Sequence, residues 1–209
     1  MAMLVAVSIM LGYFIRIRGL IPAAPFLTFD AKDVCILIGG FIFGPLAALM
    51  MSIVLALLEM VTISQSGPIG AFMNALSSAA LTCTASYVYM KNKSAKGAVI
   101  GLILGSLVAT AAMIAWNIIL IPIYMPTVTR EASLNLILPA ILPFNLIKNG
   151  LNAGVTMLVY KHVTRALKAA KVYPEINNNA ESDKFKLSIG VIIVAVIIIS
   201  TALLTLWIL

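Results

Sequence analysis

Polar side chains recur at spacings of three and four within an otherwise apolar stretch between residues 134 and 162. They are Asn145, Lys148, Asn149, Asn152 and Thr156. At these spacings the five side chains share one face of an α-helix. Amide and ammonium groups on one face can hydrogen-bond a polar ligand, whereas an unpaired charge within a membrane costs at least ~2.5 kcal/mol. We therefore expect this face to point toward the protein interior and Lys148 to meet a polar partner there.

Three further apolar stretches carry shorter polar stripes. The stripe residues are Thr110 and Asn117 in 97–122, Asn74, Ser77, Ser78 and Thr82 in 68–90, and Ser52, Glu59 and Thr62 in 45–62. A lipid-facing position would leave these groups without hydrogen-bond partners. The simplest arrangement directs all four stripes at a shared interior.

The small polar residues and the charged residues require different interpretations. Ser, Thr and Asn often join membrane helices, at about 0.6 kcal/mol per bond, so Ser52, Ser77, Ser78 and Thr82 could serve packing as well as binding. Charged groups inside membrane helices tend to mark substrate or ion paths. Glu59 and Lys148 could pair with each other, but we favour a role facing a ligand.

The elements that must position these side chains are membrane helices. Hydrophobic residues make up 62% of the 209-residue chain and charged residues only 10%, and the mean hydropathy is +1.11. Soluble domains contain roughly 25% charged residues, so this composition excludes a soluble enzyme. The net charge of +7 comes from Lys and Arg residues between apolar stretches and forms no single basic face, so it does not indicate nucleic-acid binding.

A bilayer-crossing helix needs about 20 apolar residues. By this criterion helices are expected at 2–18, 34–62, 68–90, 97–122, 134–162 and 187–208. The second is too long for one crossing and contains Gly44-Pro45. Proline interrupts helical hydrogen bonding, so we divide this stretch into a short helix at 33–43 and a longer one at 45–62.

The distribution of basic residues tests the seven-helix count. With the amino terminus inside, nine basic residues fall in cytoplasmic connections and four outside. The first group is Lys91, Lys93, Lys96, Lys161, Arg165, Lys168, Lys171, Lys184 and Lys186, and the second is Arg16, Arg18, Lys32 and Arg130. The excess inside supports this orientation and a multi-pass protein of the cell membrane.

Sequence signatures of common enzymes are absent. The chain has no GxxxxGK[ST] nucleotide loop, no HExxH and no GxSxG, and its single histidine, His162, lies at a helix end. We expect no enzymatic activity, no metal site and no cofactor bound by this chain. A binding subunit that takes energy from other proteins fits these absences.

Four motifs in order carry a family resemblance. They are Phe26-Leu27-Thr28-Phe29-Asp30-Ala31-Lys32-Asp33, Gly40-Phe41-Ile42-Phe43-Gly44-Pro45, Gly67-Pro68-Ile69-Gly70-Ala71-Phe72-Met73-Asn74 and Pro143-Phe144-Asn145-Leu146-Ile147-Lys148. Over about residues 1–165 the chain resembles the substrate-binding S-components of energy-coupling factor (ECF) vitamin transporters, most of all the riboflavin-type branch.

The resemblance implies an all-α integral membrane protein whose six-helix bundle includes one short helix. Such a subunit binds a water-soluble vitamin from outside and associates with a transmembrane coupling protein and two cytoplasmic ATPases, which use the ATP. ATP-driven changes in those partners are thought to topple the subunit in the membrane and deliver the vitamin inward.

The resemblance also implies site residues. In the riboflavin branch the ring is held by an asparagine of the fifth helix and by the asparagine and lysine of the PFNxxK motif, here Asn117, Asn145 and Lys148. The loop at 19–33 helps to cover the vitamin, so Thr28 is an expected contact, whereas Asp30 and Asp33 are expected to cap the short helix.

Two further positions follow from the family context. Asn74 could contact the ligand or join two helices. In the first helix, Ala2 and Ala6 form an AxxxA spacing, which lets a partner helix approach closely and which faces the coupling protein in this family.

Glu59 departs from the riboflavin pattern. Its carboxylate would suit a pyridoxine-like or hydroxymethylpyrimidine-like vitamin, and pantothenate would bring its own carboxylate to Lys148. We rank riboflavin first. Two other hypotheses remain: a membrane scaffold without transport, and a solitary proton-coupled carrier that uses Glu59 and Lys148.

The carboxyl-terminal part differs in character. Residues 1–165 form the predicted substrate-binding core, and 166–186, which include Asn177-Asn178-Asn179, form a predicted cytoplasmic linker. Residues 187–209 supply a predicted additional transmembrane helix without a polar stripe, to which we assign no transport role.

Overall fold

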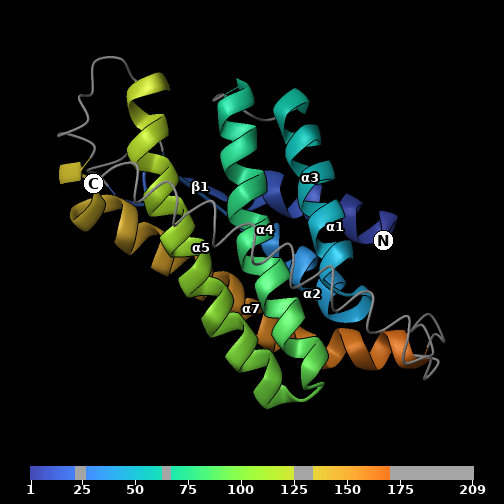
Figure 1. The fold of residues 1–209 in the computed structure, drawn as a ribbon. Helices are drawn as coiled ribbons and strands as arrows, with labels where there is room; N and C mark the ends of the chain where they lie inside the picture. The colour runs from blue at the N-terminus through green and yellow to red at the C-terminus, as the bar shows by residue number, and fades with distance from the viewer. Residues whose placement is uncertain (22–26, 63–66, 125–133, 170–209) are drawn as a thin grey trace.

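The computed structural model describes residues 1–21, 27–62, 67–124 and 134–169, and the described part is mostly helical (Figure 1). The helices are α1 (Ala2–Phe14), α2 (Asp33–Phe43), α3 (Pro45–Thr62), α4 (Gly67–Lys91), α5 (Ala95–Tyr124) and α7 (Leu142–Ala169), with a π-helical turn η1 (Ile137–Ile141) directly before α7. Two short strands, β1 (Arg16–Arg18) and β2 (Thr28–Asp30), connect α1 to α2.

The predicted break between the second and third helices is confirmed. Gly44 has φ of +95°, a left-handed conformation that glycine adopts without a steric penalty. Its N–H bonds to the carbonyl of Gly40 at 2.8 Å and ends α2. Pro45 then occupies the first position of α3, where the missing N–H costs nothing.

The first helix is shorter than predicted. The sequence favoured a helix over 2–18, but α1 ends at Phe14 and residues 16–18 form β1. The alternation Ile15-Arg16-Ile17-Arg18 is typical of a strand, but the predicted helix followed apolar length instead. β1 pairs antiparallel with β2, with Arg16 opposite Asp30 and Arg18 opposite Thr28.

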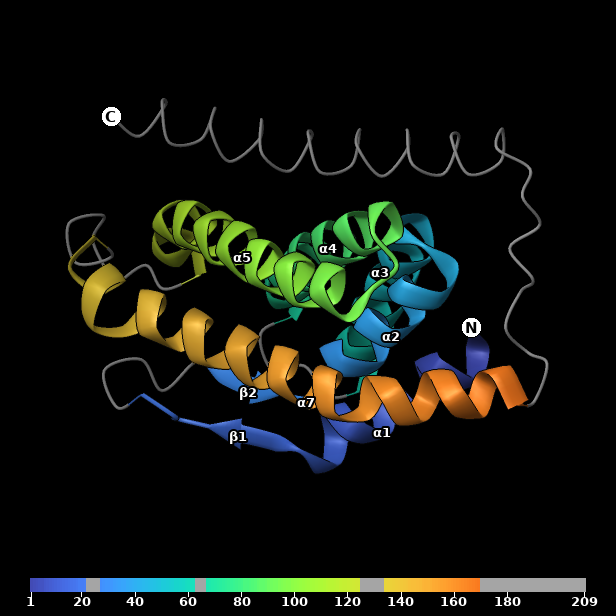
Figure 2. The same ribbon diagram turned by 90° about the horizontal axis from the view of Figure 1, so that it is seen from below.

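α4 and α5 pack closely against each other, and Gly101 and Gly105 of α5 lie at the contact. A Cβ placed on Gly101 would lie 2.6 Å from the carbonyl oxygen of Ala85, and one on Gly105 would lie 2.5 Å from that of Leu81. Glycine thus lets the two backbones approach, as small residues do between membrane helices. In Figure 2, α7 and the strands lie on the side of the molecule opposite this pair.

The described part is apolar outside and partly polar inside. Large side chains such as Val61, Leu138 and Leu158 are 81%, 76% and 75% exposed, whereas Asn117, Asn149 and Asn152 are fully buried. Two stretches, α3 and residues Ala95–Leu120 of α5, are long and apolar enough to cross a membrane. This distribution is typical of a membrane protein whose polar groups face an internal site.

The predicted linker at 166–186 and the predicted helix at 187–208 lie mostly outside the described residues. α7 continues to Ala169 and so includes the start of the stretch predicted as a linker. The rest of that linker and the additional helix predicted at 187–208 lie outside the described residues.

Candidate functional site

A cavity opens between the strands and helices α4, α5 and α7. Its empty volume is about 850 Å³, including the part open to solvent. The lining residues are Arg16, Leu27, Thr28 and Asp30 from the strands and the loop before β2, Ile69, Gly70, Met73, Asn74 and Ser77 from α4, Met113 and Asn117 from α5, and Phe144, Asn145 and Lys148 from α7. Five of the six predicted substrate contacts line this cavity: Thr28, Asn74, Asn117, Asn145 and Lys148.

Lys148 carries the positive charge of the α7 wall. Its side chain is almost fully buried, and its ammonium nitrogen lies 3.4 Å from Oδ2 of Asp30. The predicted polar partner of Lys148 is therefore the carboxylate of Asp30, on β2. Burial alone would raise the pKa of Asp30, but the ammonium groups of Lys148 and Lys32 outweigh it and hold that pKa below its ordinary value.

The amide groups of Asn117 and Asn145 have the same orientation. Nδ2 of Asn117 donates to the carbonyl of Met113 at 2.7 Å, and Nδ2 of Asn145 donates to that of Ile141 at 2.8 Å. A backbone carbonyl is only an acceptor, so each amide must direct its nitrogen to its own helix. The buried Oδ1 of Asn117 has no hydrogen-bond partner among the described residues, which leaves it available to accept a bond from a ligand.

Much of the remaining cavity wall is apolar, apart from Arg16 and Ser77. Leu27, Met73, Met113 and Phe144 line it together with Ile69, and Phe144 and Leu27 belong to a buried cluster that joins the segment around β2 to α7. Aromatic, Leu and Met side chains pack well against the faces of a flat ring. The cavity therefore combines apolar walls with a few polar groups that can fix the orientation of a ligand.

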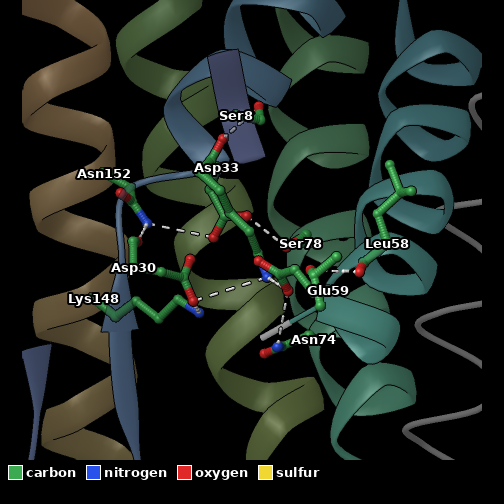
Figure 3. Close-up of polar contacts among 11 residues, drawn as sticks. Ser8, Asp30, Asp33, Leu58, Glu59, Asn74, Ser78, Lys148 and Asn152 are labelled. Carbon is green, nitrogen blue, oxygen red and sulfur yellow. Dashed lines mark hydrogen bonds and ion pairs between the residues drawn. The ribbon is translucent and has the colours of Figure 1, made fainter. Parts of the chain in front are cut away.

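Glu59 lies behind the wall formed by α4. It is not among the residues that line the cavity; its carboxylate pairs with the ammonium group of Lys32 and accepts a bond from Nδ2 of Asn74 at 3.3 Å. Figure 3 shows this contact. Glu59 and Lys148 do not pair with each other. Glu59 forms an ion pair with Lys32, and Lys148 forms one with Asp30.

The expectation that Asp30 and Asp33 cap α2 is wrong. Lys32 occupies the N-cap position and α2 has no side-chain cap bond. Asp30 contacts Lys148 instead, and the carboxylate of Asp33 accepts bonds from Ser78 and from Nδ2 of Asn152 (Figure 3). Asp30 ends β2 and Asp33 begins α2, and both carboxylates bind side chains of α4 or α7 instead of backbone N–H groups at the start of α2.

Three buried charged residues at or behind the cavity were missed: Asp30, which lines it, and Lys32 and Asp33, which do not. Lys32, which the sequence analysis places in an outer connection, is 1% exposed. One signal was available. Three charges fall within positions 30–33, at the start of the short helix α2, and the two acidic ones contact the polar stripe of α7.

Of the small polar residues that could serve either ligand binding or helix packing, one lines the cavity and three join helices or strands. Ser77 lines the cavity. Ser52 approaches Thr82 at 3.5 Å, and Ser78 bonds to Asp33, so these three join elements. Asn149 likewise joins helices, because its Nδ2 donates to Oγ1 of Thr110 on α5 at 3.3 Å.

The residues predicted to face the coupling protein, Ala2 and Ala6, lie on α1, which does not line the cavity. Ala2 and Ala6 are both exposed on α1, and the large apolar side chains Met3 and Met10 are 68% and 58% exposed on the same helix. Both alanines therefore lie on an exposed face of α1.

The chain is similar to known transport proteins. The family described as "ECF transporter, substrate-specific component" matches residues 1–160. The riboflavin transporter RibU of Staphylococcus aureus is 34% identical over 69% of this chain and 78% of its own length. Riboflavin transporters RibU of Streptococcus thermophilus and FmnP of Bacillus subtilis are each 30% identical, over 76% and 66% of this chain and 78% of their own lengths.

A solved structure shares the fold as well. The structure described as "Structure and mechanism of the S component of a bacterial ECF transporter" superposes with a TM-score of 0.68 at 32% identity, and the match covers 80% of this chain and 94% of that one. The family match runs from α1 to most of α7 and so includes the elements that line the cavity. This chain therefore belongs to the family of ECF transporter substrate-specific components.

Proposed function

We propose that this chain captures riboflavin from outside the cell and delivers it inward as part of an ATP-driven ECF importer. The observation that carries the proposal is the convergence of Asn117, Asn145 and Lys148 on one apolar-walled cavity. These residues come from two helices and match the positions that the riboflavin-type resemblance implied. The names of the relatives support the same ligand.

The chemistry of the cavity suits an isoalloxazine ring. Such a ring has extended apolar faces, which Met73, Met113 and Phe144 can cover. Its pyrimidine edge presents carbonyl oxygens and an imide N–H. An ammonium group such as that of Lys148 donates to a carbonyl, and a free amide oxygen such as Oδ1 of Asn117 accepts from an N–H.

The alternative vitamins fit the contacts less well. Pyridoxine and hydroxymethylpyrimidine were attractive because Glu59 could accept a bond from them, but its Oε2 atom already serves Lys32 and Asn74. Pantothenate would set its carboxylate against that of Asp30, which already lies beside Lys148. These contacts favour riboflavin over the other three.

Transport requires partners that use ATP. We propose that a transmembrane coupling protein contacts the outer face of α1 at Ala2 and Ala6, whose small exposed side chains permit a close helix approach, and that two cytoplasmic ATPases drive the cycle. In this arrangement the chain is a multi-pass subunit of the cell membrane that supplies recognition alone.

The ligand can be tested directly. Protein purified in detergent from cells grown in rich medium is denatured, and the released small molecules are identified by absorbance and mass. The stripped protein is then titrated into riboflavin while the quenching of flavin fluorescence is followed. We expect a flavin in the extract and saturable quenching.

Other outcomes contradict the proposal in distinct ways. Release of a pyridine or pyrimidine vitamin with no effect on flavin fluorescence would assign another substrate, and absence of any bound heteroaromatic compound would favour a scaffold. Riboflavin uptake in cells without the ATPase partners would indicate a solitary carrier.

A further inference from the structure

A buried ion pair stands one layer behind the cavity and has no part in the contacts proposed above. Lys32, just before α2, is 1% exposed, and Glu59, on α3, is 8% exposed. Their charged groups contact each other directly. Burying two charges carries a large desolvation penalty, and such pairs can often be replaced by apolar residues without loss of stability. A contribution to stability alone is therefore a weak explanation for this pair.

The second contact of Glu59 links the pair to the cavity. Oε2 of Glu59 accepts a hydrogen bond from Nδ2 of Asn74 at 3.3 Å, and Asn74 lines the cavity, whereas Glu59 does not. Figure 3 shows the nitrogen of Asn74 directed at Glu59. A carboxylate offers only acceptor atoms, so the NH₂ group of the amide must turn toward it. The carbonyl oxygen, on the other branch of the planar amide, is left for the cavity.

We propose that Glu59, held by Lys32, is a positioning residue that fixes Asn74 with its carbonyl oxygen toward the ligand. Asn74 then requires a hydrogen-bond donor on the ligand, an N–H or a hydroxyl, and rejects an acceptor at that place. This role rests on the proposed function, because it concerns the specificity of the same cavity.

The other cavity amides give this role a context. Asn117 and Asn145 also tie their nitrogens to acceptors within the protein, the carbonyls of Met113 and Ile141. Each of the three asparagines that line the cavity thus donates a hydrogen bond from Nδ2 to an acceptor within the protein. Lys148 supplies a donor among the described lining residues. A hydroxylated chain together with an imide N–H, both present in riboflavin, provides the donors that three amide oxygens demand.

A double-mutant cycle on riboflavin binding tests this role. The four proteins are the wild type, Glu59→Gln, Asn74→Ala and the double variant, and their dissociation constants come from quenching of flavin fluorescence. Neutral glutamine can donate as well as accept, so it no longer dictates the orientation of Asn74. We expect Glu59→Gln to weaken binding about tenfold when Asn74 is present and less than about twofold in the Asn74→Ala background.

Ser52→Ala is the matched control, since Ser52 is a buried polar residue of the same helix whose bonds reach Ala48 and Thr82. It should leave riboflavin affinity unchanged. If Glu59→Gln does not yield folded protein, Glu59→Asp replaces it in the cycle, because aspartate keeps the charge and withdraws the acceptor from Asn74.

The results separate this inference from the function on which it rests. Equal loss of affinity in both backgrounds, or a lower melting temperature without any change in affinity, would overturn the positioning role while leaving riboflavin capture intact. A wild-type protein that does not bind riboflavin would overturn both.

Discussion

The ammonium nitrogen of Lys148 lies 3.4 Å from the carboxylate of Asp30, although 118 positions separate the two residues. The contact joins α7 to β2 across one side of the cavity, and both side chains are almost fully buried. Because Lys32 lies 3.9 Å from the same carboxylate oxygen, the pair extends into a buried network that reaches Glu59 and Asn74.

Removing the charge of Lys148 should affect ligand binding and stability together. In Lys148→Met, the carboxylate of Asp30 loses a partner within hydrogen-bond range, and leaving such a group unsatisfied costs about 1–3 kcal/mol. We expect a lower melting temperature for the ligand-free protein and at least tenfold weaker riboflavin binding. Thermal unfolding and calorimetric titration measure the two effects. Unchanged affinity would show that Lys148 has only a structural role.

Asn145 and Asn149 provide a matched pair on one helix. Both are buried asparagines of α7, but only Asn145 lines the cavity. We expect Asn145→Ala to weaken riboflavin binding by about 1–3 kcal/mol, because a polar group of the ligand loses its partner. Asn149→Ala should lower thermal stability, through the lost bond to Thr110, and leave affinity almost unchanged. Equal losses of affinity would remove Asn145 from the site.

Larger side chains on α1 should separate binding from transport. Ala2→Leu and Ala6→Leu place bulk on an exposed face, so the bundle has room for it and riboflavin affinity should stay the same. Close approach of a partner helix would be blocked, and uptake of labelled riboflavin by whole cells should fall severalfold. Val7→Leu, at a neighbouring exposed position, is the control and should transport normally. Loss of binding and uptake together would contradict the assignment of this surface.

Glycine substitutions should test the close contact between α4 and α5. A Cβ at Gly105 would lie 2.5 Å from the carbonyl oxygen of Leu81, and backbone cannot yield as a side chain does. Gly105→Ala should therefore destabilise the protein by about 1–3 kcal/mol. At Gly150 no described atom lies within 4 Å of the added methyl group, so Gly150→Ala should be neutral or slightly stabilising. Melting temperatures in detergent report both, and equal values would contradict the packing argument.

Much of the helical framework could be predicted because its signals are local. Apolar length, the Gly44-Pro45 break and the polar stripe of α7 depend on residues close in sequence. The stripe also predicted that Asn145 and Lys148 share a buried face, and both line the cavity. The end of α1 was misplaced because the predicted helix followed apolar length and not the Ile-Arg alternation of residues 15–18, which is typical of a strand.

The sequence by itself determined the class of protein, the helices and the faces that carry polar groups. Only the tertiary structure decided which charges meet. Glu59 and Lys148 both carry charges on membrane helices and could have paired or met a ligand, yet each binds a charged residue of the segment 30–32. The reason is physical: an ion pair depends on distances of a few ångströms between side chains, and those distances follow from how β2 and the start of α2 fold between α3, α4 and α7, which no local pattern encodes.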